Sequence, residues 1–194
     1  MRHFTLKNLC DCSLEQQRGV LDIRNAEAVR KAMYTDHIIS LDEHLNYIDA
    51  LKSDDKQQIF AVLNDDAVPV GVVGLNNIDH LHKKTDWAFY LDVNARGGVG
   101  SALEIFMLDH VFSDMGLEKL NCEVLETNPA VVAMHKKFGF QEEGFRRSNV
   151  VKDGARIGVH FLGITKADWL TKKTSVIEAL SSKISDIHIE PPAG

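Results

Sequence analysis

Two stretches of this 194-residue chain combine residue types that could hold an anion and move a proton. In the first, an apolar run from Trp87 to Val93 reads as a strand and is followed by Gly97-Gly98-Val99-Gly100 and an apolar-periodic helix. Glycines let the backbone approach a phosphate closely, and the unpaired N–H groups of a helix N-terminus favour negative charge. No Gly-Lys-Ser/Thr follows, as a P-loop requires, and no later βαβ unit carries the acidic residue of a dinucleotide fold. Because glycines also serve tight turns, the run by itself is a candidate diphosphate site and no more.

The second stretch, residues 120–140, reads as a strand, an asparagine, a helix and a Gly-Phe stop. Asn128-Pro129 opens the helix, where the missing N–H of proline costs little. His135 lies in that helix, and an imidazole can donate a proton near neutral pH. Glu123 lies twelve residues earlier, on the strand face opposite Cys122, and could deprotonate an amine. The alternatives are that His135 only fills the helix and that Glu123 is a solvated carboxylate, with water removing the proton.

Together the two stretches resemble the GNAT acetyltransferases, whose hallmarks are a Q/R-x-x-G-x-G/A loop and an N-x-x-A-x-x-L-Y-x-x-x-G-F helix. Both occur here in order, about 30 residues apart, and the resemblance spans about residues 4–165. It implies the GNAT α/β (α+β) fold, with a mixed, mostly antiparallel, splayed sheet flanked by helices. It also implies direct transfer from acetyl-CoA to an amine, with no metal. Two positions depart from the pattern: Ala95 stands where Gln or Arg is usual, and His135 replaces the tyrosine that protonates the leaving thiolate.

The resemblance also implies the roles of individual residues. His135 is expected to act as the acid and Glu123 as the base, while a backbone N–H near Leu91 meets the oxyanion. The residues expected to contact acetyl-CoA are Leu91, Val93, Arg96, Gly98, Val99, Gly100, Ser101, Ala102 and Asn128.

The first third of the chain is similar to one branch of the family, the nucleotide-sugar N-acetyltransferases of pseudaminic acid biosynthesis (flagellin glycosylation). The similarity rests on Leu21-Asp-Ile-Arg-Asn25, Ala32-Met-Tyr-Thr35 and the helical stretch from His37 to Leu45. That branch acetylates the 4-amine of a UDP-linked 4-amino-4,6-dideoxy sugar. The implied substrate contacts are Arg24, Met33, His44, Asn76, Asn77 and Tyr90. An arginine suits phosphate, a methionine suits a 6-deoxy methyl group, and a histidine can bond sugar or uracil oxygens.

Two other functions stay open at this point. The spacing of Glu123 and His135 also fits an acetyltransferase for protein N-termini or polyamines. The missing tyrosine is compatible with a non-catalytic CoA-binding module. A peptide acceptor would need an open groove, whereas a UDP-sugar would need a closed pocket with a phosphate-binding cation.

The elements that must position these residues follow from periodicity and capping signals. Capping boxes at Ser13 and Ser40 predict helices after each, and Asn25 is expected to cap a short helix between them. A hairpin is expected around Lys152-Asp153-Gly154. The predicted strands are residues 4–9, 59–63, 68–75, 87–93 and 120–125. We expect residues 1–170 to form the GNAT domain and residues 171–194 a C-terminal helical extension and loose tail.

Composition narrows the partners. The net charge of −6 without a basic block argues against nucleic acid, and no apolar run approaches the roughly 18 residues of a membrane span. The three cysteines show no CxxC spacing, and no HExxH motif occurs, so no metal site is expected. The short apolar stretch at the N-terminus is not that of a signal peptide, so we expect a cytoplasmic protein with reduced thiols. The sequence leaves a homodimer open.

Overall fold

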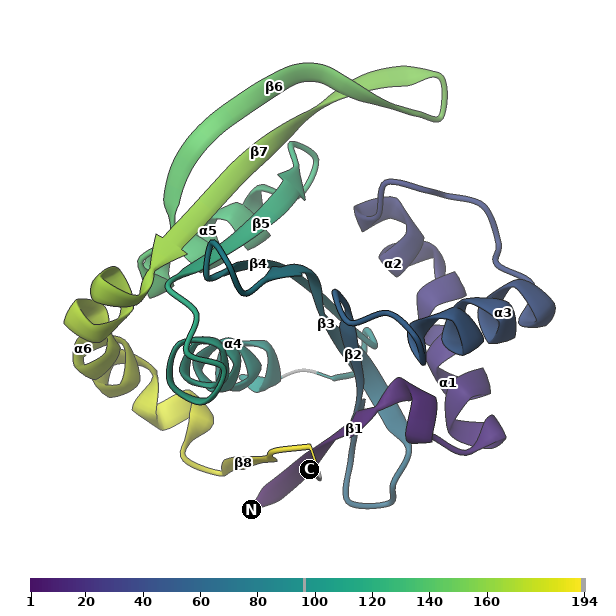
Figure 1. The fold of residues 1–194 in the computed structure, drawn as a ribbon, viewed down its shortest axis with the longest axis horizontal. Coiled ribbons are helices and arrows are strands. Elements are labelled where there is room, and N and C mark those ends of the chain that lie inside the picture. The colour runs from purple at the N-terminus through teal and green to yellow at the C-terminus, as the bar shows by residue number, and fades with distance from the viewer. Residues whose placement is uncertain (96, 193–194) are drawn as a thin grey trace.

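One eight-stranded sheet is the centre of the computed structural model, which describes residues 1–95 and 97–192. Its central strands β2 and β3 are buried over most of their length, because helices cover both faces there. Its order is β6-β7-β5-β4-β3-β2-β1-β8, and only the β4–β5 and β1–β8 pairs are parallel (Figure 1). The strands are β1 (Arg2–Asn8), β2 (Gln58–Leu63), β3 (Pro69–Asp79), β4 (Lys84–Leu91), β5 (Lys119–Leu125), β6 (Gln141–Lys152), β7 (Ala155–Thr165) and β8 (Ile187–Glu190). The predicted mixed, mostly antiparallel sheet is confirmed.

Helices cover both faces of the sheet. Figure 1 shows α1, α2 and α3 together on one side and α4 and α6 on the other, with the β6–β7 hairpin arching toward α2. The helices are α1 (Leu14–Asn25), α2 (Glu27–Ala32), α3 (Leu41–Leu51), α4 (Val99–Asp109), α5 (Pro129–Phe138) and α6 (Lys166–Ile184). A short 3-10 turn (Leu9–Asp11) follows β1, and a π-helical turn (His110–Asp114) extends α4. In the described part of the chain, no helix has the length and apolar character needed to cross a membrane.

The sheet splays open between β4 and β5. These parallel strands pair only where Lys84–Asp86 faces Lys119–Asn121. Beyond that point β4 continues along β3, and β5 continues along β7. The main apolar core, which includes Trp87, Leu103 and Trp169, fills the face covered by α4, α5 and α6. The gap therefore leaves backbone edges of two neighbouring strands unpaired directly beside the core.

The C-terminal segment packs on its own chain. Helix α6 begins at Lys166, earlier than expected, because Thr165 and Asp168 form a capping box. The Trp169 indole N–H donates to Asp109 at 2.8 Å, which joins α6 to α4. Strand β8, which the sequence pattern did not predict, pairs in parallel with β1 from Arg2 to Thr5.

Two local expectations have different outcomes. The predicted turn after β6 is confirmed, since Asp153 and Gly154 both have positive φ, at 50° and 76°. Asn25, by contrast, does not cap α2, which begins after Ala26 without a side-chain cap. Its amide instead bonds both the N–H and the C=O of Ile39, at 2.9 Å each, because the loop after α2 returns across the end of α1.

Candidate functional site

A slot of about 270 Å³ occupies the gap between β4 and β5. Its walls include Trp87 to Leu91 from one strand and Cys122 to Leu125 from the other, so that it follows the splayed edges. Asn128 and His135 line it from α5. The slot is largely apolar, and the unpaired backbone edges of β4 and β5 face it. It therefore suits an extended ligand arm that forms hydrogen bonds with these strand edges.

The N-terminus of α4, residues 98–101, is a candidate cradle for a diphosphate. Gly98 caps the helix in the left-handed conformation, with φ 96°, and no side-chain cap competes for the first amides. A Cβ added at Gly100 would lie 3.7 Å from both Phe89 and Leu91, which places the first turn of α4 against the slot. The helix N-terminus and the slot therefore form one continuous site, which fits a phosphate-bearing ligand with a long arm.

Not every residue of the predicted loop can donate. The Ala102 amide already bonds the Gly98 carbonyl at 2.9 Å, so the available donors end at Ser101. Val99 turns its side chain into the core, and Val93 is an exposed residue past the end of β4. Arg96 lies outside the described residues.

His135 is 3% exposed and contacts a carboxylate that the sequence analysis did not single out. Its Nδ1 lies 2.7 Å from Oε1 of Glu104, a fully buried residue of α4. The rings of Trp87, Phe89 and Phe140 surround the imidazole. The signal for Glu104 was present in the sequence, because a lone acid stands between Leu103 and Met107 in the apolar stripe of its helix.

Glu123 lines the slot but is not a free carboxylate. The hydroxyl of Tyr34, from the segment after α2, donates a hydrogen bond to it. Burial first, and then this bond, raise the pKa of Tyr34 well above its usual value, so the phenol stays protonated. Tyr34 therefore bridges the slot from the face that carries α1 to α3.

A second cavity, of about 380 Å³, lies on that face under α1 and α3. Met33, Ala88 and Tyr90 line both this cavity and the slot, so the two spaces meet there. Of the six residues expected to contact the acceptor, five line it: Arg24, Met33, His44, Asn76 and Tyr90. A volume of this size is typical of a site for a small molecule.

Asn77 lies outside the cavity. The register of β3 against β4 shifts after Asn76, and Asn77 adopts a positive φ of 53°. Its amide therefore turns to Asp86 and bonds it at 2.7 Å. The register shift therefore points the side chains of Asn76 and Asn77 to different surroundings, although both were predicted to contact the acceptor.

Arg24 carries an unused donor at the cavity. Its Nη2 bonds the Thr35 hydroxyl at 3.0 Å, whereas Nη1 is buried and bonds no described protein group. Burial lowers the pKa of Arg24, yet a guanidinium stays charged at neutral pH. A buried, charged N–H without a partner is costly, so this atom is suited to an anionic or oxygen-rich ligand.

The other polar groups of the cavity are mostly neutral. His44 donates from Nε2 to the Gln17 carbonyl at 3.0 Å, and burial lowers its pKa, so Nδ1 is an acceptor near neutral pH. Burial raises the pKa of the Tyr90 hydroxyl. Glu43 is the one carboxylate among the lining residues, and its Oε1 lies 2.9 Å from His37.

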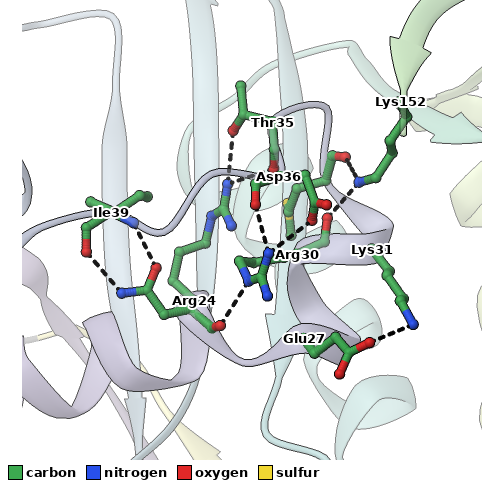
Figure 2. Close-up of polar contacts among 10 residues, drawn as sticks. Arg24, Glu27, Arg30, Lys31, Thr35, Asp36, Ile39 and Lys152 are labelled. Carbon is green, nitrogen blue, oxygen red and sulfur yellow. Dashed lines mark hydrogen bonds and ion pairs between the residues drawn. The ribbon is translucent and has the colours of Figure 1, made fainter. Parts of the chain in front are cut away.

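Buried Lys152 ties the hairpin to the wall of this cavity. Figure 2 shows its ammonium at the end of α2, where it donates to the carbonyls of Arg30 and Met33 at 2.5 Å each. Arg30 in turn bonds Asp36, and Arg24 bonds Thr35, so charged side chains hold the whole segment after α2. Sequence reasoning missed Lys152 because its partners lie about 120 residues away.

Replacing Lys152 with methionine should lower the free energy of unfolding by about 2 kcal/mol, because two charge-assisted bonds to partly buried carbonyls are lost. Urea unfolding would measure this. Lys31→Met is the matched control, because Lys31 pairs with Glu27 in solvent, and it should leave stability unchanged. Equal stability of Lys152→Met and the native protein would contradict the assigned role.

Comparison with known proteins adds a family and a set of similar structures. Residues 13–141 match the Acetyltransferase (GNAT) domain family. Spermidine N-acetyltransferase from Vibrio cholerae in complex with CoA and spermine superposes with a TM-score of 0.79 at 21% identity, over 86% of this chain and 98% of that one. A chimera of that enzyme with hSSAT gives 0.76 at 22% identity, over 86% and 98% of the two chains. At such identities the likeness concerns the fold.

Proposed function

Because the chain belongs to the GNAT acetyltransferase family and is an acetyl-CoA-dependent N-acetyltransferase, we propose that it acetylates the 4-amine of a UDP-linked 4-amino-4,6-dideoxy sugar. The observation that carries this choice of acceptor is Arg24, whose buried Nη1 bonds no described residue. Arg24 lines the second cavity, of about 380 Å³, which we call the acceptor cavity. A diphosphate linked to a sugar supplies the anionic oxygens that such a group needs.

The slot and the cradle would hold acetyl-CoA, which supplies the acetyl group as an activated thioester. Val99 to Ser101 offer the amides of the α4 N-terminus to the diphosphate. Gly98 leaves this approach clear because it lacks a side chain. These groups fit the co-substrate without a metal ligand.

The Leu91 amide is aimed into the slot. The Asp92 amide donates to Val70 on β3 at 2.8 Å, and successive amides of a strand point to opposite edges. The Leu91 N–H therefore points toward β5, where β4 has no pairing partner after Asp86. It is available to stabilise negative charge that develops on a carbonyl oxygen during attack by the amine.

Two side chains would handle protons. Glu123 would accept the amine proton directly or through water, and the hydrogen bond from Tyr34 holds its carboxylate at the wall of the slot. His135 lines the slot from α5 and would protonate the departing thiolate in place of the usual tyrosine. The acceptor amine would enter past Met33 and Tyr90, where the two spaces meet.

Polyamine acetylation is the second candidate, favoured by the fold of the similar enzymes and by Tyr47 and Tyr90, whose rings could face a cation. Against it stands the charge of the cavity. Arg24 would repel a polycation, and Glu43, the one lining carboxylate, already pairs with His37. We therefore rank it second.

Calorimetric titration of the protein saturated with CoA would separate the two acceptors. The UDP-linked amino sugar should bind, and Arg24→Ala should weaken this binding at least about tenfold, as expected for a charged hydrogen bond. Spermidine should give no heat of binding at the same ionic strength. Binding of spermidine alone would retain the family and reject the sugar.

Cys122 also lines the slot, but a covalent acetyl-cysteine is not expected. Burial raises the pKa of this thiol well above its usual value, so the nucleophilic thiolate is absent at neutral pH. Incubation with acetyl-CoA alone should leave the intact mass of the protein unchanged. An added acetyl group, mapped to Cys122, would contradict direct transfer.

A further inference from the structure

A carboxylate that no lysine or arginine of residues 1–95 and 97–192 pairs with lies behind His135 in the core. Glu104 is fully buried, its Oε1 bonds His135 Nδ1 at 2.7 Å, and its Oε2 is buried with no partner among the described residues. Glutamate is almost never fully buried unless it is paired. An apolar residue would fill this position of α4 at lower cost, so the acid requires a reason beyond packing.

We propose that Glu104 is a positioning residue, which holds the His135 ring with Nε2 toward the slot and shares with it the proton that the departing thiolate takes. The proposal rests on the acetyl transfer proposed above and adds a residue to it. Glu104 itself does not touch substrate, since it acts through the imidazole.

The surroundings of the ring support one fixed orientation. Trp87, Phe89 and Phe140 lie around the imidazole, with centroids 5.5, 6.3 and 5.1 Å away. Glu104 engages Nδ1, which leaves Nε2 as the nitrogen that can serve a ligand in the slot. In serine hydrolases a carboxylate behind an imidazole likewise orients the ring and stabilises its protonated form.

The number of protons that Glu104 and His135 hold together follows from their burial. Burial raises the pKa of Glu104, which favours retention by the pair of one proton beyond the one that a neutral imidazole carries. Whether that proton resides on Glu104 or on Nδ1, Nε2 carries a hydrogen. When the thiolate leaves, the Nε2–H bond breaks and an S–H bond forms, and Glu104 remains as a carboxylate that accepts from Nδ1–H. Solvent then returns the proton through the slot.

Among the described residues, one further titratable group is coupled to this pair from a neighbouring strand. The Cys122 thiol, on β5, has its pKa raised first by burial and then by Glu104. It therefore stays neutral and adds no charge beside the pair. A pH dependence that arises here belongs to Glu104 and His135 as a unit.

A double-mutant cycle tests the coupling. Glu104→Gln keeps the size of the side chain and should lower kcat about 100-fold, with both KM values within about twofold. In a His135→Asn background the same change should cause no further loss. Glu118→Gln, the same substitution at an exposed position, is the control and should leave the kinetics unchanged. Losses that simply add in the double variant would overturn the proposal.

A second readout does not need the acceptor to be known. In protein labelled with ¹⁵N-histidine, the ring signals of His135 should report a hydrogen on Nε2, and Glu104→Gln should shift these signals at a fixed pH. Glu104→Met provides the same comparison if the glutamine variant does not fold. Unchanged His135 signals would overturn the pairing even if the enzyme is active. A clear shift without turnover of the sugar would instead reject the acceptor and keep the pair.

Discussion

Replacing Arg24 with alanine should lower kcat/KM for the UDP-linked amino sugar about 100-fold, because a charged hydrogen bond to phosphate contributes about 1.5–3 kcal/mol. The effect should appear in the KM of the acceptor. KM for acetyl-CoA should stay within about twofold, since Arg24 lines the acceptor cavity and not the slot. Initial-rate kinetics with each substrate varied in turn would measure both constants.

The matched control is Arg18→Ala. Arg18 lies on the same helix, and its substitution removes the same charge. Its side chain is exposed and does not line the acceptor cavity. Its kinetics should equal those of the native enzyme. Equal losses in the two variants would show that net charge, and not a specific contact, governs acceptor binding. Arg24→Lys should recover only part of the activity, because an ammonium cannot make the paired contacts of a guanidinium.

Gly98→Ala should be the most damaging single substitution in the diphosphate cradle. The residue has a φ of 96°, where an L side chain is strained, and a Cβ there would collide with the Lys183 carbonyl of α6. Strain and overpacking together should lower the free energy of unfolding by about 3 kcal/mol. The affinity for acetyl-CoA should fall as well, because α4 must shift to relieve the contact. Urea unfolding and calorimetric titration with acetyl-CoA would measure the two effects.

Gly116→Ala separates the two causes. Gly116 also has a positive φ, of 66°, but an added Cβ would meet nothing within 4 Å. It should therefore lose only about 1 kcal/mol and keep its affinity for acetyl-CoA. If Gly98→Ala were no worse than this control, the packing of α6 against the cradle would not constrain the loop.

Local patterns were enough to predict most of the fold. The capping box at Ser13 and the turn at Asp153-Gly154 form where they were expected, because short-range hydrogen bonds and backbone preferences determine them. Strand β8 could not be predicted from four residues, since its pairing with β1 depends on α6 returning along α4. The failed cap at Asn25 has the same origin, since a distant loop, at Ile39, takes its amide.

In the candidate site too, features set by local sequence were predicted and features set by distant contacts were not. Glu123, His135, Leu91 and Asn128 line the slot, and five of the six expected acceptor contacts line the second cavity. The glycine loop lies beside them at the start of α4, whereas Val93 is exposed past the end of β4 and a local register shift turns Asn77 away. The side chains that hold them in place were missed. Glu104, Tyr34 and Lys152 each bond a group more than 30 residues away, so no spacing rule connects the partners.

Turnover with competing acceptors tests the central claim most directly. Release of the CoA thiol should be followed with acetyl-CoA and, in parallel, the UDP-linked 4-amino-4,6-dideoxy sugar, spermidine and N-terminal peptides. The account predicts that kcat/KM for the nucleotide sugar exceeds that for the other acceptors at least about 100-fold, a margin that one charged contact can supply. Faster turnover of spermidine or of a peptide would contradict the proposed acceptor. Tight binding of acetyl-CoA without turnover of any acceptor would contradict the catalytic account itself.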